Sequence, residues 1–279
     1  MPNTNRILVP WTPTEFIRIE SGPFATSMGT AKVKTNATFG YLKVLGNDEG
    51  PHALAREYVG SSLAKWFGLN VPDFAILNLE AIDCYPLPKN AKALPGPAFV
   101  SRHIAGRTWG KDEAELPRLE NPADITRLVV FDNWVRNYDR HPPDLRTWKP
   151  NYANVYFGET ERPEWYRLYA IDHTHCFERG QELQPSLDSV GKIQDDGVYG
   201  LFTQFVPRID RGELAWCKAM LQSLERDAIR AIVAGIPREW DVPDAARTAL
   251  IEFVLKRAGY LASKIESGWG VDFWEPRGV

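Results

Sequence analysis

The sequence has little cysteine and no long apolar run, and each shortage excludes a class of protein. Its three cysteines, Cys84, Cys176 and Cys217, show no C-x-x-C spacing. This argues against a disulfide framework and fits a reducing compartment. No stretch approaches the roughly 20 apolar residues that a membrane helix needs, and the first residues lack the apolar core of a signal peptide. We therefore expect a cytoplasmic protein that does not act at a membrane.

The chain also lacks an excess of charge of either sign. It has 33 Lys and Arg residues against 36 Asp and Glu residues, a net charge of -3 and a pI near 6.0. Such a balance gives no general attraction to nucleic acid or anionic lipid, so direct nucleic-acid binding is not expected. Hydrophobic residues make up 44% of the 279 residues, which suffices for a sizeable core in one bilobal unit or two modest domains.

The N-terminal part of the chain is predicted to be mostly β-sheet with one helix. Residues 39–45, "FGYLKVL", alternate and place Lys43 on a face with aromatic residues. Residues 51–72 show helical spacing, with Gly68 expected just beyond the helix and Glu57 on the flank of its buried stripe. Two further strands are predicted on either side of the proline-rich loop "YPLPKNAKALPGP", in "FAILNL" and "AFVSRHI".

From about residue 106 the pattern becomes mainly helical. The stretch "NPADITRLVVFDNWVRNY" carries helix-start signals at Asn121 and Pro122 and predicts a largely buried helix. That helix leads to the tripeptide D-R-H, residues 139–141. The strands "NVYF" and "YRLYAID" then predict a hairpin with Asp172 at its end. Two amphipathic helices are predicted after it, in "RGELAWCKAMLQSLERDAIRAIVAG" and "PDAARTALIEFVLKRAGYLASKIE".

The order of these polar residues indicates phosphoryl transfer from ATP. This chemistry needs a strand Lys and a helix Glu to hold the phosphates, and an Asp to orient or deprotonate the attacking hydroxyl. It also needs an Asn and a second Asp, whose hard oxygens suit magnesium. We expect an α+β, bilobal kinase-like fold, with a sheet-rich N-lobe over residues 1–105 and a mainly helical C-lobe over residues 106–279.

Three segments resemble the HipA-like serine/threonine kinases, whose fold is similar to that of the phosphatidylinositol kinases. They are "NYDRHPPD…NVYF", "YAIDHTHCF" and "REYVGSSLAKWFGLNVP". The resemblance implies that ATP and magnesium are the cofactors and that Asp139 is the catalytic base, in a loop that His141 orients. The other implied roles are phosphate contact by Lys43 with Glu57, magnesium binding by Asn154 and Asp172, and adenine binding by backbone groups near Ser101 and His103.

The asparagine of this motif does not follow the family spacing. The family places it five residues after the aspartate, where this sequence has Asp144. Asn151 and Asn154 come after an apparent insertion, "LRTWKP". Asn154 is favoured because a predicted strand follows it directly, while Asp144 and Asn151 stay open as alternatives.

The segment expected to cover the ATP phosphates, Ser21–Thr35, contains glycines but no G-x-G-x-x-G motif. Its position alone therefore assigns it, and Ser27 and Gly29 are its candidate nucleotide contacts. HipA-like kinases are known for autophosphorylation in this loop, so Ser27 is also the first candidate for modification. A phosphate there would carry a charge of about -2 and would be drawn outward by Arg102 or Arg140.

The leading function is phosphorylation of a protein serine or threonine with ATP and magnesium. A small-molecule or lipid kinase would use the same catalytic parts, although the lack of a basic amphipathic helix weakens the lipid version. A nucleotide-binding pseudokinase or scaffold is the non-enzyme alternative. The presence of Lys43, Asp139 and Asp172 argues against it, because loss of any one is the usual sign.

Two other interpretations receive little support. The cluster of His173, His175 and Cys176 suggests a zinc site, but few histidines remain elsewhere to complete one. The toxins that pair with HipB are longer and carry an extra N-terminal subdomain, so their DNA-binding complex is not expected here, and the sequence gives no support to an antitoxin partner. A protein substrate is the expected partner.

Overall fold

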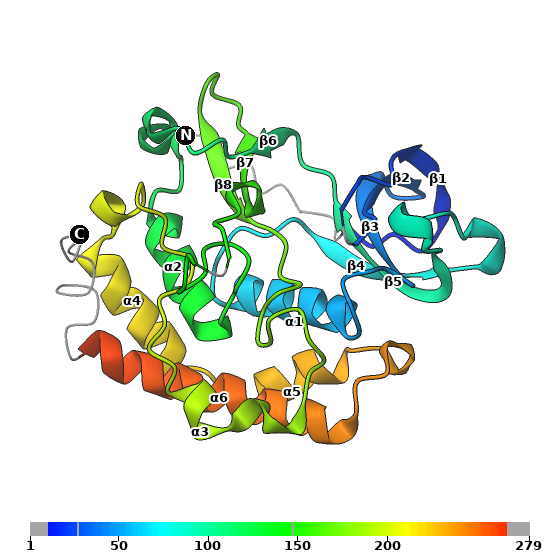
Figure 1. Cartoon of the computed structure of the whole chain (residues 1–279). Helices are drawn as coiled ribbons and strands as arrows, with labels where there is room; N and C mark the ends of the chain where they lie inside the picture. The colour runs from blue at the N-terminus through cyan, green and yellow to red at the C-terminus, as the bar shows by residue number, and fades with distance from the viewer. Residues whose placement is uncertain (1–10, 27, 147, 267–279) are drawn as a thin grey trace. The chain divides into compact units, whose positions relative to one another are not determined.

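The chain forms two compact units in this computed structural model, which is drawn in Figure 1. The residues that the structure describes are 11–26, 28–146 and 148–266. The first unit contains the chain up to Asp48 together with Pro72–His103, and the second contains Glu49–Val71 and the chain from Ile104 onward. Helix α1 (Ala53–Trp66) therefore lies in the second unit, although the expected division at residue 105 placed it in the first.

The first unit is built on an antiparallel sheet with the strand order β1-β2-β3-β5-β4. Its strands are β1 (Phe16–Ser21), β2 (Ala31–Thr35), β3 (Phe39–Leu45), β4 (Phe74–Leu79) and β5 (Leu94–Arg102). Strands β3 and β4 lie where the alternation predicted them. Strand β5 begins earlier than predicted, inside the proline-rich segment, and β2 occupies the end of the predicted phosphate loop. In β2 every second residue is buried. Because β2 begins at Ala31, the loop that precedes it is shorter than predicted and covers residues 22–30.

The two faces of this sheet have different surroundings. Leu42 and Val44 of β3 are fully buried in an apolar cluster that also includes Trp11, Tyr85 and Leu87. The alternate residues of β3 are only half-buried, and Lys43 is one of them. Burial of the apolar face thus fixes the register of β3 and leaves Lys43 on the opposite face.

The second unit contains the longer helices and a small sheet with the order β6-β7-β8. Besides α1, its helices and strands are β6 (Gly106–Thr108), α2 (Ala123–Val135), β7 (Val155–Glu159), β8 (Tyr166–Ala170), α3 (Val190–Ile193), α4 (Arg211–Gln222), α5 (Arg226–Ala234) and α6 (Asp244–Glu266). Short 3₁₀ helices occur in both units, at Ala81–Asp83, Pro88–Asn90, Glu113–Arg118, Tyr152–Asn154, Pro185–Asp188, Val206–Arg208 and Arg238–Trp240. None of the helices in the described part of the chain combines the length and apolar character needed to cross a membrane.

The helix boundaries follow local hydrogen bonding. Gly68, at φ +80°, lies just beyond α1 as predicted. Helix α2 begins at Ala123, since the side chain of Asn121 does not cap it but pairs with both backbone groups of Leu168 in β8. The single helix predicted over residues 211–235 is in fact two helices, α4 and α5. Ser223 ends α4 with hydrogen bonds from its N–H and its hydroxyl to carbonyl oxygens of the preceding turn.

Candidate active site

The D-R-H loop begins where helix α2 ends. Arg136 terminates the helix in the left-handed conformation, at φ +51°. Asn137 then donates a hydrogen bond to Asp132 Oδ1 at 3.1 Å and accepts one from the backbone N–H of Asp139 at 3.2 Å. Because Asp132 and Asn137 are both fully buried, the last turn of α2 determines where Asp139 lies.

Arg140 joins the three segments that carry the candidate residues. Its Nε donates to Asp132 Oδ2 in α2 at 2.7 Å, and its Nη1 donates to the carbonyl oxygens of Asn154 and Ile171. Asn154 and Ile171 lie just beyond the last pair of the β7–β8 hairpin, Val155 with Ala170. One guanidinium therefore holds the entrance and the exit of the hairpin together.

This position corrects the role considered for Arg140 in the sequence. Its side chain is completely buried, so it is unable to draw a phosphorylated loop outward. Burial raises the pKa of its partner Asp132 to about 6, while the charge of Arg140 opposes this rise. The signal that was available is the pair Asp132-Asn133 within the otherwise apolar second half of the helix, because buried polar groups there need partners.

Three donors surround the carboxylate of Asp139. Asn151 Nδ2 and Asn154 Nδ2 both donate to Oδ2, at 3.0 and 2.6 Å. Trp148 Nε1 donates to Oδ1 at 3.3 Å. Trp148 was not among the predicted site residues, since it lies in the apparent insertion that the family motif does not contain.

The three alternatives for the metal-binding residue differ in how their oxygens are used. The Oδ1 atom of Asn151 accepts the backbone N–H of Ala153 at 3.2 Å. Asp144 is bound to Arg146 through both carboxylate oxygens, at the surface. Asn154 uses its amide nitrogen on Asp139, and within the described residues its amide oxygen accepts no hydrogen bond. Of the three side chains, Asn154 is the one whose oxygen is left for a cation.

Asp172 follows the hairpin in the left-handed conformation, at φ +58°. The hydroxyl of Thr174 donates to its Oδ1 at 3.1 Å. Asn154 and Asp172 together would present an amide oxygen and a carboxylate, which is the hard donor set that magnesium takes alongside water and phosphate oxygens. In chemical type these residues fit magnesium.

Helix α1 holds the segment after Asp172 from the other side. The carboxylate of Glu57 is buried, and its Oε2 accepts the backbone N–H of His173 at 2.8 Å. Ser61 hydrogen bonds with His173 Nδ1 at 3.1 Å. A Cβ atom on Gly60 would lie 2.4 Å from the Cβ of His173, so glycine is required for this approach.

The two histidines of the "HTHC" segment face different partners. His173 contacts Ser61, whereas His175 Nε2 lies 3.0 Å from Glu49 Oε1. Residues 11–26, 28–146 and 148–266 contain no group of three or more His, Cys, Asp or Glu side chains that could hold a metal ion. The described residues therefore give no support to a zinc site.

Comparison with known families shows which family the chain belongs to. Residues 38–276 match the model of the HipA-like kinases. The chain belongs to this family. It is a HipA-like kinase, as predicted from the D-R-H and I-D-H motifs.

Two solved structures were compared with the chain. The Helicobacter pylori proinflammatory kinase CtkA matches with a TM-score of 0.57 and 11% identity, over 95% of this chain and 99% of that one. HipA from Shewanella oneidensis MR-1, in a complex with HipB and operator DNA, matches with a TM-score of 0.42 and 14% identity, over 88% of this chain and 62% of that one. A search of curated proteins found no match. The likeness to CtkA confirms the predicted kinase-like fold.

In this HipA-like kinase, His141 of the D-R-H loop is partly buried. Its ring meets Phe202 edge-on at 5.4 Å, and its carbonyl oxygen accepts the backbone N–H of Gly200 at 2.9 Å. Burial lowers the pKa of His141, which favours its neutral form. A Cβ atom on Gly200 would lie 2.3 Å from Asp132 Oδ2, so this glycine permits the close approach to the buried ion pair.

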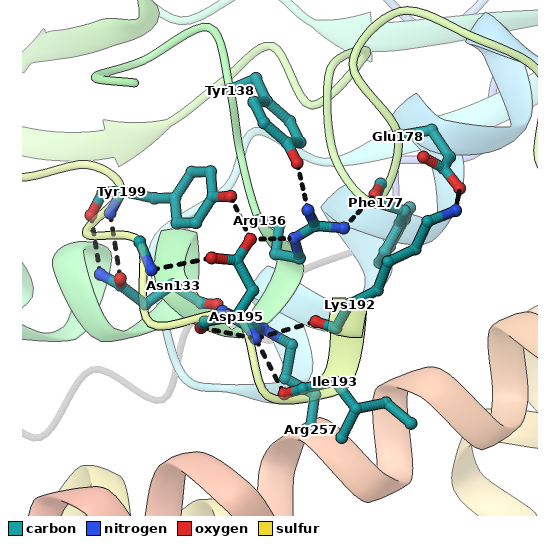
Figure 2. A network of polar contacts seen from close by, with 11 residues as sticks. Asn133, Arg136, Tyr138, Phe177, Glu178, Lys192, Ile193, Asp195, Tyr199 and Arg257 are labelled. Atoms are coloured by element: carbon teal, nitrogen blue, oxygen red, sulfur yellow. Dashed lines mark hydrogen bonds and ion pairs between the residues drawn. The ribbon is translucent and has the colours of Figure 1, made fainter. Parts of the chain in front are cut away.

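A second polar network holds the segment around residues 192–199 against helices α2 and α6, as Figure 2 shows. Asp195 accepts hydrogen bonds from Arg136 Nε at 2.8 Å and from the hydroxyl of Tyr199 at 2.6 Å. Asn133 pairs with both backbone groups of Tyr199. Arg257 of α6 donates to four carbonyl oxygens, those of Asn133, Lys192, Ile193 and Asp195. Through Gly200 this network reaches the D-R-H loop.

The predicted residues of the first unit can be placed only within that unit. Lys43 lies on the half-buried face of β3, and Gly29, at φ +56°, is buried beside Leu87. Ser27 lies outside the described residues. The adenine contacts expected near the end of β5 stay a prediction; the backbone N–H of His103 donates to the carbonyl oxygen of Phe39 at 2.9 Å. Ser101 is paired on both sides of β5, with residues of β3 and β4.

Proposed function

We propose that this HipA-like kinase transfers the γ-phosphoryl group of ATP to a serine or threonine hydroxyl of a protein, with magnesium. The observation that carries the proposal is the Asp139 carboxylate, held on Oδ2 by Asn151 and Asn154. A carboxylate with one oxygen held by two hydrogen bonds can accept a hydroxyl proton on its other oxygen from a defined direction. The buried Asp132–Arg140 pair keeps that geometry rigid.

The chain supplies the other roles from separate elements. Asn154 and Asp172 would hold magnesium, which supplies neutralisation of phosphate charge when bound. Glu57 keeps the segment after Asp172 in place through the N–H of His173. Lys43 is proposed to bind the ATP phosphates from the half-buried face of β3, and Gly29 and Ser27 to lie in the loop that covers them.

The Asp139→Ala variant tests the proposal. Loss of a general base lowers the rate by about 10²- to 10⁴-fold, while nucleotide affinity should stay close to that of the wild type because Asp139 acts on the hydroxyl. Transfer is measured with labelled ATP and a lysate treated with phosphatase, followed by mapping of the modified residues. Asp144→Ala is the matched control, since it removes a carboxylate from the same loop at the surface.

Several outcomes would contradict the proposal. Near-normal transfer by Asp139→Ala would mean that Asp139 is not the base. Labelled small molecules without labelled protein would identify a small-molecule kinase. Nucleotide binding without any transfer by the wild type would indicate a scaffold.

A further inference from the structure

The inserted segment between the D-R-H motif and Asn151 is a loop with exposed residues, in which Trp148 is partly buried. It is closed by a hydrogen bond from the backbone N–H of Asn151 to the carbonyl oxygen of Arg140, at 2.9 Å. Leu145 is 56% exposed and the side chain of Arg146 is 90% exposed, whereas Trp148 is partly buried. Trp148 therefore makes contacts with the rest of the protein that its exposed neighbours do not make.

Those contacts join the catalytic loop to the segment that follows Asp172. The indole N–H of Trp148 donates to Asp139 Oδ1 at 3.3 Å. The ring of His175 meets the indole edge-on at 5.2 Å, and the guanidinium of Arg179 lies 4.7 Å from the indole centre. A cation above an aromatic face and an edge-on ring are both attractive arrangements. They help to hold the indole where its N–H reaches Asp139 Oδ1.

The oxygen that Trp148 occupies is the one that the acceptor needs. An ionised carboxylate has two oxygens and only accepts hydrogen bonds. Asn151 and Asn154 both bind Oδ2 of Asp139, so Oδ1 is the oxygen left for an incoming hydroxyl. The indole N–H therefore stands where the hydroxyl proton would be presented.

We propose that Trp148 controls access of the acceptor to the base: its indole N–H binds Asp139 Oδ1 in the free kinase, and the acceptor hydroxyl must displace it. This inference rests on the proposed function of Asp139. Trp148 takes no part in the chemical step. It makes a hydrogen bond that each acceptor must replace, and it thereby lowers acceptor affinity and excludes acceptors that bind weakly.

The test is Trp148→Phe, which removes the N–H and keeps an aromatic ring against His175 and Arg179. Trp165→Phe is the matched control, because the guanidinium of Arg162 stacks on Trp165 in the same way, at 3.6 Å, in the turn between β7 and β8. Phosphoryl transfer from ATP is followed with two acceptors, dephosphorylated casein and water. A hydrogen bond to a charged group corresponds to about 10-fold or more in binding, and we expect the KM for casein to fall by about 3- to 30-fold.

In Trp148→Phe the kcat and the KM for ATP should not change, and the rate of ADP formation with water should rise. In Trp165→Phe none of these quantities should change. If kcat falls while KM for casein is constant, Trp148 orients the base and the inference is wrong. If Trp148→Phe equals the wild type, only the ring matters and the inference is also wrong.

A second measurement does not depend on turnover. In protein labelled with ¹⁵N-tryptophan, the indole signal missing from Trp148→Phe belongs to Trp148. Its proton should exchange with solvent faster in Asp139→Ala than in the wild type, and Asp144→Ala should leave it unchanged. Equal exchange in all three proteins would overturn the contact itself. Absence of transfer to both acceptors by the wild type would instead overturn the proposed function, and the inference about acceptor access with it.

Discussion

The two units of this kinase hold their candidate residues in different ways. In the first unit an apolar cluster on one face of the sheet fixes β3, and Lys43 occupies the other face. In the second unit the candidate residues are themselves fixed by buried charges, above all by Arg140 and Asp132. A change at Lys43 should therefore alter function without altering the fold, whereas a change at the buried pair Asp132–Arg140 of the second unit should alter both. The predictions below test this difference.

The largest effect is expected from Asp132→Ala. Removing one partner leaves Arg140 buried without its counter-charge, which costs about 3–5 kcal/mol of unfolding free energy. The catalytic loop should also lose its position, so phosphoryl transfer should disappear with the stability. Urea unfolding followed by fluorescence measures the first effect and labelled ATP the second.

The control for Asp132→Ala is Arg146→Ala, which breaks a surface pair with Asp144. This change should leave the unfolding midpoint where it is, because exposed ion pairs contribute little. If both variants unfolded alike, the buried pair would not be what holds the second unit.

Asp172→Asn is expected to weaken magnesium-dependent nucleotide binding by at least about tenfold. Even mutation of a residue that only hydrogen bonds to a metal ligand changes metal affinity by about 10- to 100-fold. The urea midpoint should move little, because Asn keeps the size of the side chain. Calorimetric titration with ATP, with and without magnesium, measures the change. Equal ATP affinity under both conditions, in wild type and variant, would remove Asp172 from the metal site.

The three alternatives after the D-R-H motif should rank in a definite order. Asn154→Ala removes a hydrogen bond to Asp139 and the proposed metal ligand, and we expect kcat/KM to fall by about tenfold or more. Asn151→Ala removes only a hydrogen bond to Asp139, and Asp144→Ala removes neither. If Asp144→Ala had the largest effect, Asp144 would keep the family spacing and the inserted segment would loop out.

The smallest effect on stability is expected at Lys43. Lys43→Ala should weaken ATP binding several-fold and change the unfolding free energy by no more than about 0.5 kcal/mol, as for other side chains outside the core. Lys89→Ala is the control, since Lys89 is a strongly exposed lysine of the same unit. A large loss of stability in Lys43→Ala would mean that fold and function are not separable in the first unit.

The features that could be predicted from the sequence are those that depend on residues close together in the chain. Alternation along β3 and β4 and the hairpin of β7 and β8 were predicted, because each depends on neighbouring residues. Strand β2 was missed because its segment, rich in Gly, Ser and Thr, resembles a loop. The D-R-H motif indicated Asp139, and its order relative to Asp172 indicated the family.

The contacts that fix the site could not be predicted in this way. Arg140 reaches Asn154 and Ile171 from far along the chain, and Arg257 reaches Asn133 across 124 residues. Such pairs leave no periodic signal. Trp148 was missed for another reason: it lies in an insertion, where comparison with a family motif gives no information.

Helix α1 also has a consequence for how the protein is made. On the ribosome its residues emerge before several of their partners, since Gly60 packs against His173, Trp66 against Trp134 and Tyr58 against Trp240. The sheet of the first unit is likewise incomplete until β5 has been synthesised, because β3 pairs with it. The strands of the first unit have all been synthesised by residue 103, but α1, which lies between them in the sequence, must wait for partners that follow much later. A nascent chain stopped after residue 103 would expose the apolar side of α1 and would be a target for chaperones.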